Sequence, residues 1–201
     1  MPIFRGTNNI SKIFRGNTEI VKAFRGTDLI FTSFQLPQYE LIADVNVTAN
    51  TTQIDFDNLN ITKDDELRLV YTMIGNTTSP TTYQTIFNDV NSNYTRQQLF
   101  GDNTIISSSR NSTAQFVVAR SNAKSNGFSD IKISNNNRFV FQSQFSYFIG
   151  AQSSSILNVN WNVANTSTVT IITKLSIVSS NSGGIASGSR LTLYKVNTGV
   201  A

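Results

Sequence analysis

The chain contains no cysteine and no histidine, and each absence excludes a class of chemistry. Without cysteine it has no disulfide, no thiol nucleophile and no cysteine-ligated zinc. Without histidine it has no Ser-His-Asp triad, no imidazole proton shuttle and no histidine-ligated metal. We therefore predict a protein that is not an enzyme and that uses no metal and no cofactor.

Charge is also scarce, since charged residues make up 14% of the 201 residues, against about a quarter in a typical domain. Asn, Ser and Thr are abundant instead, at 24, 24 and 23 residues. This composition favours many short strands with polar turns over helices. The net charge of +4 is too small to indicate a nucleic-acid partner.

Long apolar runs are missing as well. No run reaches the roughly 18 residues of a membrane-spanning helix, and residues 1–5 lack the continuous apolar stretch of a signal peptide. We therefore expect that the protein is made in a cytoplasm and is not inserted into a membrane. If it is exported, we expect it to leave by another route such as lysis.

A ten-residue repeat occurs three times within residues 3–34. Each copy contains Phe-Arg-Gly, followed by Thr or Asn and then by Ile or Leu, and the copies start at Phe4, Phe14 and Phe24. Glycine followed by a short polar residue is typical of a tight hairpin turn. The eight residues left between turns make a strand of ordinary length. The repeat therefore predicts a small antiparallel meander.

Both faces of such a meander would carry apolar side chains, as Ile10 and Phe14 alternate with Ile13. A ribbon of about 30 residues cannot bury two apolar faces by itself. The segment is basic, with five Lys or Arg against Glu19 and Asp28. It either packs on its own domain or anchors and oligomerises the protein, and the second reading is favoured because short repeats are uncommon in single-domain enzymes. The candidate interface residues are Phe4, Arg5, Lys12, Phe14, Arg15, Lys22, Phe24, Arg25 and Phe34.

Residues 35–38 are predicted to be a linker, because Pro37 would interrupt a strand ladder. Apolar residues then alternate with polar ones with a period of two, which is typical of half-buried strands. The expected strands are 39–47, 53–56, 66–74, 82–87, 95–100, 114–119, 128–133, 138–145, 155–163, 168–177 and 190–196. Residues 39–201 are therefore predicted to be an all-β, antiparallel, jelly-roll-like β-sandwich.

Two acidic groupings could carry chemistry. Asp55 and Asp57 share one face of a strand, and residues 64–66 follow Thr62 in a turn that Thr62 is placed to cap. Carboxylate oxygens suit calcium, but the spacing of a calcium loop is missing. A glycosidase pair would need two convergent carboxyl groups, one with a raised pKa. Solvated carboxylates are the favoured interpretation of both groupings.

Aromatic residues offer a second candidate site. Tyrosine rings stack on sugars, and amide groups bind hydroxyls, so the combination of Tyr, Asn and Thr is common in carbohydrate sites. The candidate ligand-binding residues are Tyr83, Tyr94 and Tyr147. The alternative is core packing, which the alternation already predicts for Tyr71 and Trp161.

The repeats also resemble a known sequence pattern. Residues 10–20 and 20–30 resemble an N-terminal repeat common in structural proteins of tailed bacteriophages, with Phe where Tyr is frequent. Residues 39–42, 54–65 and 188–195 resemble small virion surface domains, particularly of phages that infect gut Bacteroidales. No functional residue carries over from this resemblance.

The resemblance implies a virion component, made in the bacterial cytoplasm and usually trimeric. We expect a head fibre or capsid decoration protein, in which residues 1–34 bind the capsid or another virion protein and residues 39–201 are displayed as a homotrimer. The alternative is a tail-associated receptor-binding protein that adheres to a bacterial surface glycan.

Overall fold

The computed structural model describes residues 13–15, 18–20, 22–25, 28–32, 38–76, 81–102, 105–112, 115–119, 124–148 and 156–197. The chain divides into two compact units: Tyr39–Asn197 form the larger one, and the smaller one contains the N-terminal repeats. Each unit is described by itself.

The N-terminal unit contains two antiparallel hairpins. Their strands are β1 (Ile13–Arg15), β2 (Thr18–Ile20), β3 (Lys22–Arg25) and β4 (Asp28–Thr32). Arg15 is paired with Thr18 and Arg25 with Asp28. The predicted turn residues between these pairs lie outside the described residues. The described strands form two separate two-stranded sheets and not one continuous meander.

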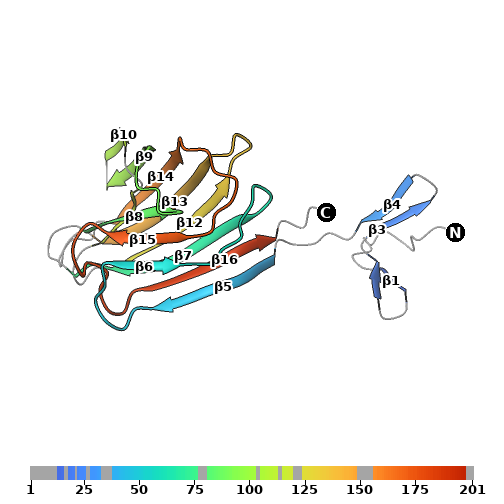
Figure 1. Ribbon diagram of the computed structural model, residues 1–201, viewed down its shortest axis with the longest axis horizontal. Coiled ribbons are helices and arrows are strands. Elements are labelled where there is room, and N and C mark those ends of the chain that lie inside the picture. The colour runs from blue at the N-terminus through green and yellow to red at the C-terminus, as the bar shows by residue number, and fades with distance from the viewer. Residues whose placement is uncertain are drawn as a thin grey trace. The chain divides into compact units, whose positions relative to one another are not determined.

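The larger unit is a sandwich of two antiparallel sheets, and Figure 1 shows the large sheet running from β10 at the top to β5 at the bottom. The large sheet has eight strands in the order β10-β9-β14-β13-β12-β7-β16-β5. They are β5 (Gln38–Asn46), β7 (Glu66–Ile74), β9 (Tyr94–Asp102), β10 (Ile105–Asn111), β12 (Lys124–Ile133), β13 (Phe139–Phe148), β14 (Ile156–Asn165) and β16 (Arg190–Asn197).

The small sheet has four strands in the order β11-β8-β15-β6. They are β6 (Gln53–Phe56), β8 (Thr81–Phe87), β11 (Gln115–Ala119) and β15 (Leu175–Ser179). The sequence-based prediction of an all-β antiparallel sandwich is confirmed, and its jelly-roll connectivity stays a prediction.

Alternation along the strands builds the core between the sheets. On β7, Leu67, Leu69, Tyr71 and Met73 point inward and are at most 3% exposed. The small sheet meets them from the other side, where Phe87 stacks on Phe139 of the large sheet with ring centroids 4.4 Å apart. One face of the large sheet is thereby buried in the core. The opposite face of the large sheet is not part of this core.

Two strand predictions differ from the structure. Residues 107–109 lie outside the strands predicted from the sequence, but they belong to β10 and pair with residues 98–100 of β9. Serine side chains carry no strand signal, so this edge strand depends on backbone pairing with its neighbour. The strand expected at 168–177 begins only at Leu175, and Ile172 forms an isolated bridge with Ile61 instead.

Gly127 lies in the middle of the large sheet, paired with Tyr71 on one side and Phe145 on the other. A Cβ atom at this position would lie 2.6 Å from the Phe145 Cβ and would also overlap the Gln144 carbonyl oxygen. Separations this short are not tolerated, so only glycine permits the observed approach of β12 and β13.

We expect Gly127→Ala to lower the free energy of unfolding by about 1–3 kcal/mol, because the added methyl group forces neighbouring backbone apart. Urea unfolding followed by circular dichroism measures the change. Lys132→Ala, an exposed position on the same strand, is the control and should stay within about 0.5 kcal/mol of the unmodified protein. Equal stability of the two variants would contradict the packing argument.

Candidate functional site

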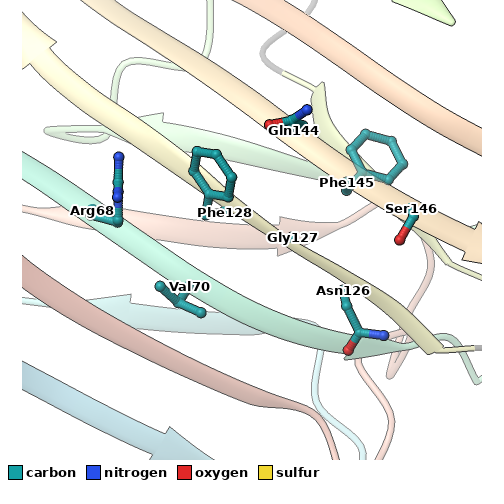
Figure 2. A pocket seen from close by; sticks show the side chains of 8 residues that line it. All are labelled: Arg68, Val70, Asn126, Gly127, Phe128, Gln144, Phe145 and Ser146. Carbon is teal, nitrogen blue, oxygen red and sulfur yellow. The ribbon is translucent and has the colours of Figure 1, made fainter.

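The outward face of the large sheet carries a hollow of about 530 Å³ across β7, β12 and β13 (Figure 2). We call it the first hollow, and its lining residues are Arg68, Val70, Asn126, Gly127, Phe128, Gln144, Phe145 and Ser146. Ligand sites in proteins commonly have volumes of about 300–1,000 Å³. The first hollow therefore has the size of a small-molecule site.

Two apolar residues of the first hollow, Val70 and Phe128, point away from the core. On β7 the inward positions are odd-numbered, so Val70 points outward and is 41% exposed. On β12 the buried positions are also odd-numbered, which places Phe128 on the same outward face as Val70. Side chains alternate strictly along a strand, so neither residue contributes to the core.

Arg68 is the most connected side chain of this face. Its guanidinium donates to both carboxylate oxygens of Asp130, from Nε at 2.6 Å and from Nη2 at 2.8 Å. Nη1 donates to the Tyr39 hydroxyl at 2.7 Å. The hydrogen bond with Asp130 raises the pKa of Arg68 above its ordinary value. Arg68 therefore stays charged and is held in one orientation.

Aromatic rings surround this guanidinium. Its carbon lies 4.9 Å from the ring centroid of Phe128 and 5.5 Å from that of Tyr39. Tyr39 in turn packs edge-on against Tyr194, with centroids 5.9 Å apart. We call Tyr39, Arg68, Phe128, Asp130 and Tyr194 the outer-face cluster. It spans β5, β16, β7 and β12, which are consecutive in the sheet.

A second hollow of about 250 Å³ adjoins the first. Its lining residues are Val70, Tyr71, Thr72, Arg190, Thr192 and Tyr194, so the two hollows share Val70.

The cation of the second hollow is paired with a carboxylate. Arg190 donates to both oxygens of Asp44, at 2.9 Å and 2.7 Å. Thr192 Oγ1 donates to the same carboxylate at 3.0 Å. The hydrogen bond from Arg190 is the main cause that lowers the pKa of Asp44.

The polar groups of the first hollow are neutral apart from Arg68. Thr72 Oγ1 donates to Asn126 Oδ1 at 2.8 Å across the two strands. The oxygen of this amide is thereby engaged, and its nitrogen remains as a donor. Gln144 and Ser146 occupy outward positions on β13. Amides and a hydroxyl therefore provide the hydrogen-bonding capacity of the site.

The predicted ligand-binding tyrosines lie elsewhere. Tyr83 is fully buried, and its hydroxyl donates to the Gly184 carbonyl at 3.0 Å. Tyr94 is 3% exposed, and its hydroxyl donates to the Val90 carbonyl at 2.8 Å. A stacking platform needs an exposed ring, so these two residues are corrected from ligand contacts to core residues. Tyr147 lies in β13, opposite Ser125 of β12, and its role stays a prediction.

The predicted interface residues belong to the N-terminal unit. Phe14 and Arg15 lie in β1, and Lys22, Phe24 and Arg25 lie in β3. The other four predicted interface residues lie outside the described residues, and these are Phe4, Arg5, Lys12 and Phe34. Because the repeats form two separate hairpins, Phe14 and Phe24 belong to different sheets.

The acidic residues have protein partners. Asp55 accepts from Gln53 and from Ser176, and these hydrogen bonds lower its pKa although partial burial opposes the change. Asp65 closes the predicted turn by accepting from the backbone nitrogen of Thr62 at 2.9 Å. In the part of the chain that the structure describes, no group of three or more acidic side chains is placed to hold a metal ion.

The sequence carries a signal for the outer-face residues that the prediction of Tyr83, Tyr94 and Tyr147 as ligand contacts did not include. Phe128 is out of phase with Ile131 and Ile133 in its own strand, and Tyr194 is out of phase with Leu191 and Leu193. An apolar residue of the wrong parity in an alternating strand marks the face opposite the core. The sequence carries no such signal for which residues of neighbouring strands are paired.

No protein-family model, curated protein or solved structure matches the chain. Within the described ranges, no helix is long and apolar enough to cross a membrane. The function therefore has to be argued from residues and geometry.

We expect Asp130 and Arg68 to be energetically coupled by about 1 kcal/mol, because the pair is bidentate and partly shielded from water. A double-mutant cycle with Asp130→Asn, Arg68→Gln and the combined variant measures this coupling in urea unfolding. The cycle cancels the separate contacts of Arg68 with Tyr39 and Phe128. Strictly additive losses would show that the pair contributes no coupling.

We also expect Asp44 to make folding sensitive to acid. Its pKa is lower in the folded protein than in the unfolded chain, so its stabilisation is present above about pH 4 and is lost as the pH falls through the folded-state value. The difference in unfolding free energy between the unmodified protein and Asp44→Asn should therefore shrink as the pH is lowered. Asp64→Asn, at an exposed turn position, is the control. A difference that is constant with pH would refute this assignment.

Proposed function

We propose that the chain is a non-enzymatic structural protein of a tailed-bacteriophage particle, in the role of a head fibre or capsid decoration. Its N-terminal repeats attach to the capsid or another virion protein. Its sandwich is displayed outward, and the protein assembles as a homotrimer.

The observation that carries this proposal is the division of the chain into two unlike units. The N-terminal hairpins have described strands of only three to five residues. An isolated two-stranded hairpin is marginally stable in water and needs a surface to pack against. The sandwich has a core of its own between two sheets. One unit is therefore suited to attachment and the other to display.

Composition and charge agree with this division of labour. The first 34 residues contain five basic and two acidic residues, which accounts for +3 of the net charge of +4. A basic attachment segment would be drawn to an acidic capsid exterior. Trimerisation would cover apolar faces that the repeats of a single chain cannot bury.

The hollows on the outer face favour a second candidate, a tail-associated receptor-binding protein. This function shares the displayed sandwich but requires a site for a ligand on it. The two adjoining hollows of about 530 Å³ and 250 Å³ support this candidate as places where a ligand could bind. The two functions differ in where the N-terminal unit is mounted on the particle.

Deletion of residues 1–34 is expected to leave a folded, soluble sandwich that no longer associates with phage particles. Circular dichroism and thermal unfolding check the fold, and immunogold electron microscopy of particles checks association. Labelling of heads supports the decoration role, and labelling of tails supports the receptor-binding role.

A full-length variant with Arg5, Arg15 and Arg25 changed to Gln is the matched control for charge. It should bind particles more weakly, and the loss should be greatest at low salt, because exposed charges are screened as ionic strength rises. Particles that still carry the truncated chain would rule out attachment through the repeats.

A further inference from the structure

The two hollows lie next to each other on the outward face of the large sheet. They share Val70, and their linings run from β13 through β12 and β7 to β16, in the order of the strands. This feature belongs to the sandwich alone and does not depend on how the N-terminal repeats are used.

We propose that the joined hollows are a binding site for an uncharged oligosaccharide. The two hollows lie side by side, so a single sugar ring would occupy only one of them. A chain of linked sugars can occupy both while it crosses the strands. The apolar, polar and charged groups of the lining each favour this class of ligand.

The apolar contacts suit the C–H faces of sugar rings. Val70 is 41% exposed at the point that both hollows share. Phe128 contributes an aromatic ring to the first hollow, and Tyr194 contributes one to the second. Aromatic side chains combine a large apolar surface with little conformational entropy to lose on binding. Each hollow therefore has one ring to orient a sugar.

The polar contacts suit neutral hydroxyls. Asn126, Gln144 and Ser146 all line the first hollow (Figure 2), and Asn126 is paired with Ser146 on the neighbouring strand. The Gln144 amide offers a donor and an acceptor side by side, which matches a pair of neighbouring sugar hydroxyls, and Asn126 offers its amide nitrogen as a donor. The hydrogen bond from Thr72 to Asn126 holds this amide in place.

The charges of the site argue for an uncharged ligand. Arg68 is held by Asp130, and Arg190 is held by Asp44, each through two hydrogen bonds. An acidic sugar would have to compete with a carboxylate for each guanidinium. A cationic ligand would meet a guanidinium in each hollow. Each lining arginine is already compensated, so neutral hydroxyls are the groups that the lining recognises.

The site is also rigid before any ligand arrives. Its side chains project from adjacent hydrogen-bonded strands, and the outer-face cluster fixes Arg68 between two rings. Preorganised sites lose less entropy on binding than flexible loops do. We therefore expect the same geometry with and without the sugar.

The test is binding of the full-length protein to defined glycans by titration calorimetry and affinity electrophoresis. The neutral probes are maltoheptaose, cellohexaose, mannan and galactan, and the acidic probes are polygalacturonate and heparin. At least one neutral probe should bind the unmodified protein. Phe128→Ala and Gln144→Ala should each weaken this binding by about tenfold, the loss of one good contact.

Gln97→Ala is the matched control. This exposed glutamine lies on β9 and is not part of either lining. It should bind the neutral probe as the unmodified protein does. If Phe128→Ala does not fold, Asn126→Ala replaces it, since this exposed amide contributes nothing to the core.

Four results would overturn the proposal. The first is that no neutral probe binds. The second is that only the acidic probes bind. The third is that binding to a neutral probe is unchanged in both Gln144→Ala and the folded variant at Phe128 or Asn126. The fourth is that the variants change the oligomeric state in ultracentrifugation, which would make this face an interface between copies of the chain.

Discussion

The structure depends on covering one face of an eight-stranded sheet with a sheet of only four strands. Side chains alternate along every strand, so covering one face determines the orientation of all of them. The inward positions become a shared core in which Phe87 and Phe139 join the two layers. The outward positions of the same strands are released from packing. The two faces therefore carry different kinds of side chain, although residues of the two faces alternate in the sequence.

The outward face carries ion pairs next to apolar residues. Its lining arginines are paired with acids on neighbouring strands, Arg68 with Asp130 and Arg190 with Asp44. Phe128 and Val70 lie among these pairs and the neutral amides. A face kept only for solubility would need neither apolar residues nor fixed guanidinium groups. The proposed recognition of a neutral ligand would account for both features.

The N-terminal repeats illustrate the opposite case, in which local sequence determines local structure and little else. Each pair of neighbouring strands forms its own antiparallel hairpin. The described hairpins do not join into one sheet. Strands this short leave their apolar residues in need of a partner. The proposed attachment to a particle is the use of such a segment that best fits its basic charge.

The sequence by itself determined the fold class and much of the strand pattern. Alternation is a local signal, and the strands expected at 53–56 and 66–74 coincide with Gln53–Phe56 and Glu66–Ile74. The serine-rich edge strand β10 carried no such signal and was missed.

Only the tertiary structure decided which side chains meet. Arg68 and Asp130 are 62 residues apart, and no local pattern reveals that their strands are neighbours in register. The same structure placed Tyr83 and Tyr94 in the core and left Phe128 beside a hollow. Strand orientation follows from a period of two along one segment, whereas a site requires the register between segments, which is set by the packing of the whole sandwich.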